Sequence, residues 1–87
     1  MKTIELRLFG IYREYQPSSM LQLAIADNAT VADLRSALRA HAEMNWPNCS
    51  RNLIVATAFA SDSSIMRDAD VIPDCDYMAA LPPVSGG

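Results

Sequence analysis

The chain has 87 residues, of which 51% are hydrophobic and 20% are charged, which suits one globular domain with a modest core and excludes a disordered composition. Its net charge of −3 argues against nucleic acid as the main ligand, because phosphate binding depends on clustered cations. The sequence contains neither an apolar run near the ~20 residues of a membrane span nor a signal-peptide core, so we expect a cytoplasmic protein without a membrane partner.

Alternating apolar and polar residues predict a β-hairpin at the start of the chain. Within residues 2–9, the side chains of Ile4, Leu6 and Leu8 fall on one face of an extended strand, which is the pattern of a half-buried strand. The alternation resumes over residues 20–26 after a polar turn that contains proline and serine. The two strands therefore share one apolar face, which must pack on a core.

An amphipathic helix follows the hairpin. Thr30 stands at its predicted N-cap with Asp33 three residues later, a near relative of the capping box. Apolar residues then recur at steps of three and four, and Pro47 predicts that the helix has ended by residue 46. Arg35 and Arg39 lie four residues apart on the predicted outer face, where solvent or a partner would contact them.

The second half of the chain is more polar and predicts two strands. Leu53–Ala60 is a short apolar and β-branched run, which favours a strand inside the sheet. The aspartates between residues 68 and 76 favour turns and not a metal site, because their spacing lacks the EF-hand pattern. Residues 77–81 predict a last short strand. Cys49 and Cys75 have no metal-ligand spacing, and we expect free thiols that pack as small hydrophobic side chains.

The order strand, strand, helix, strand, strand predicts an α+β domain, with a mixed sheet of four to five strands packed on one main helix. A hairpin followed by a helical crossover that returns parallel to the first strand is the arrangement that right-handed crossovers permit. We therefore predict a β-grasp domain over residues 1–81 and a flexible tail over residues 82–87.

The tail combines a stiff segment with a slim one. Pro82 and Pro83 have a fixed φ and hold the chain extended. Gly86 and Gly87 have no side chain and would fit a narrow channel in another protein. We expect this tail to present the Gly87 carboxylate to a partner, and the alternative is an ordinary frayed terminus.

Three segments of the sequence carry a family resemblance. They are Leu8-Phe9-Gly10 followed by Tyr12-Arg13-Glu14, Thr30-Val31-Ala32-Asp33-Leu34, and the closing Pro82-Pro83-Val84-Ser85-Gly86-Gly87. With them, nearly the whole chain resembles the small, sulfur-carrying subunits of molybdopterin synthase, which are ubiquitin-like. The chain departs from that family at Asp74-Cys75-Asp76, where the family usually has Asp-Gly-Asp.

The resemblance implies that the chain carries sulfur and catalyses nothing itself. An E1-like enzyme would use ATP to adenylate Gly87, and a sulfur donor protein would displace AMP to leave a thiocarboxylate. The tail would then enter the large subunit of a heterotetrameric synthase, where two such sulfurs convert a cyclic pterin phosphate precursor into molybdopterin. No bound cofactor or metal is implied. The residues that thread the tail into the partner would be Pro82, Pro83, Val84, Ser85 and Gly86, with the reacting atom on Gly87.

Apolar side chains near the tail are candidates for docking on the partner. We expect Phe9 and Leu81 to serve as anchors, with Phe59 as a third candidate. Ordinary core packing is an equal alternative for Phe9 and Phe59. The aromatic residues Tyr12, Tyr15 and Trp46 are compatible with either core or interface contacts.

Three other functions stay open from the sequence. The same carrier chemistry could supply sulfur for thiamin thiazole, a sulfur amino acid or tRNA thiolation, although the proline pair favours the molybdopterin branch over the thiazole branch. An activated Gly87 could instead form an amide with a lysine, which would make the chain a protein modifier. A ubiquitin-like binding module that never reacts is the third alternative.

Overall fold

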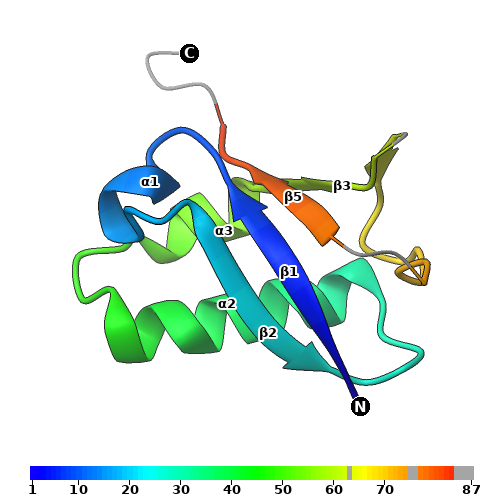
Figure 1. The fold of residues 1–87 in the computed structure, drawn as a ribbon. Coiled ribbons are helices and arrows are strands. Elements are labelled where there is room, and N and C mark those ends of the chain that lie inside the picture. The colour runs from blue at the N-terminus through cyan, green and yellow to red at the C-terminus, as the bar shows by residue number, and fades with distance from the viewer. Residues whose placement is uncertain (63, 75–76, 84–87) are drawn as a thin grey trace.

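The computed structural model describes residues 1–62, 64–74 and 77–83. Its elements are β1 (Lys2–Leu8), α1 (Tyr12–Tyr15), β2 (Met20–Ile25), α2 (Val31–Asn45), α3 (Arg51–Ala56), β3 (Ala58–Ala60), β4 (Ile65–Met66) and β5 (Tyr77–Leu81). The strands form one mixed sheet in the order β2-β1-β5-β3-β4, and the long helix α2 lies across one face of it (Figure 1). Among the described residues, no helix is long and apolar enough to cross a membrane.

The predicted hairpin is confirmed. Strands β1 and β2 pair antiparallel, from Lys2 opposite Ile25 to Arg7 opposite Met20. Alternate residues of both strands are buried, as the period of two predicts. The loop between them contains the short helix α1, where the sequence predicts a turn.

The predicted amphipathic helix and its cap are also confirmed. The Asp33 amide donates to Thr30 Oγ1 at 3.3 Å, and the Thr30 amide donates to Asp33 Oδ2 at 2.9 Å, so the two residues form a complete capping box. This box satisfies amides that the first turn of a helix leaves open. The buried stripe of α2 consists of Val31, Leu34, Leu38 and Ala42.

The prediction of one strand over residues 53–60 is wrong for its first part. The first four of these residues lie in α3, and only the last three form β3. Ser50 caps the start of α3, since its hydroxyl accepts from the Asn52 amide at 3.1 Å. The end of α3 is satisfied by Arg35, whose Nη1 donates to the Ile54 carbonyl at 2.8 Å. A local cap from Ser50 and a donor from Arg35 of α2 therefore override the local preference for a strand.

The topology differs from the prediction, because the strand that runs parallel to β1 is not the one that follows the helices. The parallel neighbour of β1 is the last strand, β5, with Glu5 opposite Tyr77 and Leu8 opposite Ala80. Strand β3, which follows the helices, pairs antiparallel with β5. The two-residue strand β4 pairs with β3 and was expected to be loop. Because β1 and β5 are parallel, both strands end at the same end of the sheet.

Arg35 does not lie on a solvated helix face, in contrast to the prediction. Its side chain is only 19% exposed, and its Nη2 donates to Asp68 Oδ1 at 2.7 Å. Its guanidinium lies 4.9 Å from the centre of the Phe59 ring. Arg39, one turn later, is exposed as predicted and pairs with Glu43 at 3.2 Å. The two arginines thus have different roles: Arg35 joins α2 to other elements, and Arg39 pairs within its own helix.

The aspartate-rich segment forms a turn, as predicted. The Arg67 amide donates to Asp70 Oδ2 at 2.8 Å. The Asp70 carbonyl accepts from the Val31 amide at 2.9 Å, so the turn packs on the start of α2. Residues 75 and 76 lie outside the described residues, and among those described no group of three or more acidic, histidine or cysteine side chains could hold a metal ion. Cys49 is a free, half-buried thiol, and burial raises its pKa.

Candidate functional site

A groove of about 610 Å³ lies where β1 and β5 leave the sheet. We call it the exit groove. The start of β1 lies at the opposite end of the sheet (Figure 1), so this end of the sheet gathers the segments that follow β1 and β5, together with part of α3. The residues that line the exit groove are Phe9, Gly10, Ile11, Glu14, Leu53, Leu81, Pro82 and Pro83.

The exit groove exposes large apolar side chains. Phe9 is 43% exposed and Ile11 is 44% exposed, while Leu81 and Leu53 are half-buried. Exposed aromatic and aliphatic side chains around a hollow are typical of a surface that binds another macromolecule. The structure therefore brings together the two main predicted docking residues, Phe9 and Leu81. It adds Ile11 and Leu53, which no pattern in the sequence indicates.

Phe59 requires a correction. Its side chain is fully buried and lies opposite Ala80 in the sheet, on the core side. Its ring also packs against the Arg35 guanidinium. Phe59 is thus a core residue that a partner cannot contact.

Tyr12 fixes the wall of the exit groove that is formed by the loop after β1. Its side chain is fully buried, and its hydroxyl lies 2.5 Å from Thr57 Oγ1. The Thr57 hydroxyl donates to the Leu53 carbonyl at 2.7 Å, so the Tyr12 hydroxyl must be the donor in the first of these bonds. Burial raises the pKa of Tyr12 to about 12, which keeps it a neutral donor at physiological pH. This chain of hydrogen bonds ties α1 to α3.

The aromatic residues whose role the sequence left open form an intramolecular cluster. The Tyr15 ring stacks on Trp46 with centres 5.7 Å apart, and the Tyr12 ring lies 6.0 Å from Trp46. His41 meets the edge of Trp46 at 5.2 Å. Aromatic pairs at these distances add to the stability gained by burial. The cluster anchors α1 on α2, and with it the loop that carries Phe9.

The other wall of the groove begins with the proline pair. Pro82 is half-buried and Pro83 is exposed. A Cβ atom added to Gly10 would lie 2.8 Å from Pro82 Cγ, so the proline ring packs directly on the Gly10 backbone. The predicted tail residues Val84, Ser85, Gly86 and Gly87 lie outside the described residues, and their threading role stays a prediction.

The fold and the groove define the class of the protein: it is a ubiquitin-like protein with the β-grasp fold. SAMP1 of Haloferax volcanii, small archaeal modifier protein 1, has a similar structure with a TM-score of 0.70 and 25% identity, over 99% of this chain and all of that one. A complex of subunits 1 and 2 of the molybdopterin-converting factor from Helicobacter pylori is also similar, with a TM-score of 0.56 and 22% identity, over 99% of this chain and all of the matched one.

A relative in sequence gives the family. The molybdopterin synthase sulfur carrier subunit of Synechococcus elongatus is 33% identical over 87 residues, which cover 98% of this chain and 97% of that protein. No family model matches the chain. At this identity over the full length, the chain belongs to the family of molybdopterin synthase sulfur carrier subunits, as its motifs predicted.

Proposed function

We propose that this chain is the sulfur carrier subunit of a molybdopterin synthase and that Gly87 holds the sulfur as a C-terminal thiocarboxylate. One observation carries the proposal beyond family membership. The parallel pairing of β5 with β1 puts the base of the tail beside the exposed side chains of Phe9 and Ile11. A partner that binds the exit groove would therefore hold the segment that leads to Gly87.

The proposed chemistry begins with the Gly87 carboxylate, which is ionised at neutral pH because an α-carboxyl has a pKa of roughly 3.5. On an E1-like enzyme it attacks the α-phosphorus of ATP, which releases pyrophosphate and forms an acyl adenylate. A donor protein then delivers sulfur at the oxidation level of sulfide to the acyl carbon, and AMP leaves. The resulting thiocarboxylate is a better nucleophile than the carboxylate.

The final acceptor in this proposal is a cyclic pterin phosphate held by the large synthase subunit. The Helicobacter pylori complex of subunits 1 and 2 supports a large subunit as partner for this chain too, in a heterotetramer that provides two sulfurs. In this scheme ATP is bound by the activating enzyme, in the cytoplasm. The chain itself supplies the docking surface, the tail and the reacting atom.

Intact-mass measurement tests the chemistry. The chain is incubated with an E1-like activating enzyme, ATP and a sulfide donor, and we expect a species heavier by one oxygen-to-sulfur exchange. One residue added after Gly87 should abolish this species. One residue added before Met1 is the matched control and should leave it intact, because β1 starts at the opposite end of the sheet (Figure 1). An unchanged mass under these conditions contradicts the proposal.

A protein modifier is the second candidate function, and the likeness to SAMP1 at 25% identity favours it. The activation step is the same in both cases, and the fates differ at the acceptor. A modifier would form amide bonds between Gly87 and lysine side chains of other proteins. Adducts of that kind in cells, with no thiocarboxylate form of the chain, would support the modifier and exclude the carrier.

Phe9→Asp tests the docking surface. Burying an unpaired carboxylate at a docking site is costly, so we expect binding to the large subunit to weaken by about 30-fold or more, as measured by calorimetry. Val71→Asp is the matched control, because Val71 is 57% exposed and lies in the loop that pairs with Thr30, away from the groove. Equal effects of the two substitutions would contradict a docking role for Phe9.

A further inference from the structure

Gly10 occupies a position where a side chain would collide with the base of the tail. Its φ of +59° lies in the left-handed region, which favours glycine. A Cβ atom on this residue would lie 2.8 Å from Cγ and 3.7 Å from Cδ of Pro82. The proline ring is closed onto its own backbone and cannot rotate away as a flexible side chain would. Apart from the small movement of Cγ that a change in ring pucker allows, relief of the collision has to move the backbone of residue 82 or of residue 10.

Both sides of this contact are held by the domain. The Gly10 carbonyl accepts from the Arg13 amide at 3.1 Å, and the preceding Phe9 carbonyl accepts from the Tyr12 amide at 3.3 Å. Tyr12 itself is fully buried. On the other side, Leu81 is the last residue of β5 and lies opposite Ala58. Pro82 is thus the first residue after the sheet, and Gly10 belongs to a fixed loop.

We propose that Gly10 is a positioning residue for the tail, because its missing side chain lets Pro82 pack on the loop after β1 and this contact sets the direction in which the chain leaves the exit groove. The inference deepens the proposed sulfur-carrier function, and its consequence for the reaction rests on that function. A reacting group at the end of a tail has to be aimed at its acceptor, and a displacement of 1 Å can slow a reaction by orders of magnitude.

A different explanation is that Gly10 serves only to permit the left-handed turn. The two explanations differ in whether Pro82 matters. Backbone strain from a side chain at residue 10 is the same whatever residue 82 is, whereas the collision needs the Cγ and Cδ atoms of the proline. Pro83 is exposed, and none of its atoms lies within 4 Å of the added Cβ. It therefore offers a matched control.

The test is a double-mutant cycle on the full chain. Gly10→Ala is measured alone and together with Pro82→Ala or Pro83→Ala, with the activating enzyme at saturation. We expect Gly10→Ala alone to slow thiocarboxylate formation about tenfold. In the Pro82→Ala background, adding Gly10→Ala should slow it by less than about twofold. The cost should remain about tenfold in the Pro83→Ala background. Equal costs in all three backgrounds would overturn the proposal.

A second measurement does not depend on sulfur chemistry. In NMR spectra of the free chain, Gly10→Ala should shift the resonances of residues 81–83, and unshifted resonances there would overturn the inference. If wild-type chain gains no sulfur, the proposed function fails while this measurement still decides the role of Gly10. Gly10→Asn covers the case in which alanine prevents folding, because asparagine tolerates the left-handed region but retains a Cβ. It should shift the same resonances.

Discussion

Residues 2–46 and the described residues between 51 and 74 of this domain differ in the length of their elements and in how those elements are held. In the first region, apolar residues of β1, β2 and α2 are buried together over long elements. In the second region the elements are short: α3 has six residues, β3 has three and β4 has two. Elements of that length bury little surface of their own, so they depend on contacts with the rest of the domain.

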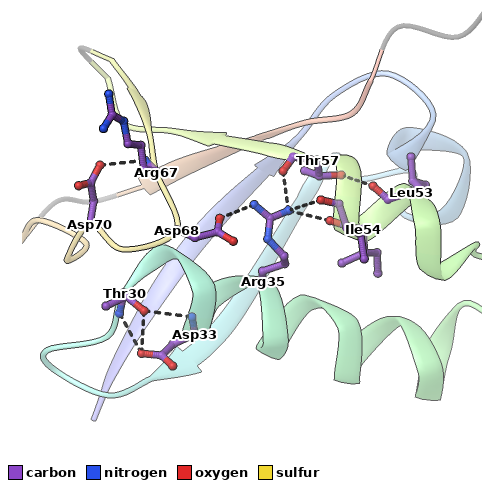
Figure 2. A network of polar contacts seen from close by, with 10 residues as sticks. Thr30, Asp33, Arg35, Leu53, Ile54, Thr57, Arg67, Asp68 and Asp70 are labelled. Atoms are coloured by element: carbon purple, nitrogen blue, oxygen red, sulfur yellow. Dashed lines mark hydrogen bonds and ion pairs between the residues drawn. The ribbon is translucent and has the colours of Figure 1, made fainter.

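Among side chains, Arg35 supplies the main polar contact between the two regions (Figure 2). It projects from α2 and donates to the carbonyls of Ile54 and Thr57, at 2.8 and 2.6 Å, and to the Asp68 carboxylate. One side chain thus fixes the end of α3, the start of β3 and the loop after β4. Burial along long elements therefore holds the first region, whereas the short elements of the second region combine a few buried side chains, Ile54, Phe59 and Ile72, with polar contacts from Arg35.

The largest effect is expected in the first region, from Leu38→Ala. Leu38 is fully buried in α2, and truncation of a buried leucine leaves a cavity that costs about 3 kcal/mol of unfolding free energy. Urea denaturation followed by circular dichroism measures this loss. Because Leu38 belongs to the shared core, hydrogen exchange should accelerate in β1, β2 and α2 together. Acceleration confined to α3 would contradict a shared core.

Arg35→Met should cost less, about 2 kcal/mol, but act on the second region. The substitution keeps most of the aliphatic contact and removes the Arg35 donor from the carbonyls of Ile54 and Thr57, of which the Ile54 carbonyl keeps only the Thr57 amide at 3.3 Å. We expect hydrogen exchange to accelerate in α3 and β3 and to stay slow in β1 and β2. Arg39→Met is the matched control on the same helix, and it should cost less than about 0.5 kcal/mol because Arg39 is exposed. If both substitutions lowered the unfolding free energy equally, Arg35 would have no special role in holding the second region.

The same contrast explains how much of the fold the sequence could predict. Alternation in β1 and β2 and the cap of α2 are local patterns, and each was visible in consecutive residues. The end of α3 is not local, because it is satisfied by Arg35, 19 residues before Ile54 in the chain. A run of apolar and β-branched residues without that information favours a strand, so Leu53–Ala60 was wrongly predicted as one element.

The site was predictable in part for a related reason. Phe9 and Leu81 each follow or end a strand, and they were predicted from their closeness to the tail, whereas their meeting depends on the parallel pairing of β1 with β5, which the sequence did not predict. Phe59 was ambiguous because the face of a strand cannot be assigned when the strand itself is wrongly bounded. Gly10 left a sequence signal, a glycine directly after a strand, but its contact with Pro82 needs coordinates.

Thr30→Ala should have a smaller effect, about 1 kcal/mol. The threonine hydroxyl accepts from the Asp33 amide at 3.3 Å, and alanine leaves that amide without its side-chain acceptor. Thr30→Ser keeps the hydroxyl and should restore most of the loss. Because the Thr30 hydroxyl caps only the first turn of α2, we expect faster hydrogen exchange at the start of the helix and not at its end. A loss spread evenly along the helix would argue against a capping role.

The smallest effect at neutral pH is expected at the joint between the two regions, from Tyr12→Phe. The hydroxyl of Tyr12 is the only part removed, and Thr57 keeps its bond to the Leu53 carbonyl, so the cost should lie below about 1 kcal/mol. Urea denaturation at pH 7 measures it. A cost as large as that of Arg35→Met would mean that the Tyr12 hydroxyl, and not Arg35, is the main polar link between the regions.

The contribution of Tyr12 should also depend on pH with a defined sign. Its pKa is about 12 in the folded chain against an ordinary value of 10, so the folded state holds the phenol proton more tightly than the unfolded state. The stability due to this group is complete below pH 10 and is lost as pH rises from 10 through 12. The difference in unfolding free energy between wild type and Tyr12→Phe cancels other titrations, and it should be constant from pH 7 to 9 and fall above pH 10. A difference that stays constant to pH 11.5 would mean that Tyr12 is accessible to water in the folded chain, and α1 would then be no firm support for the loop that carries Phe9 and Gly10.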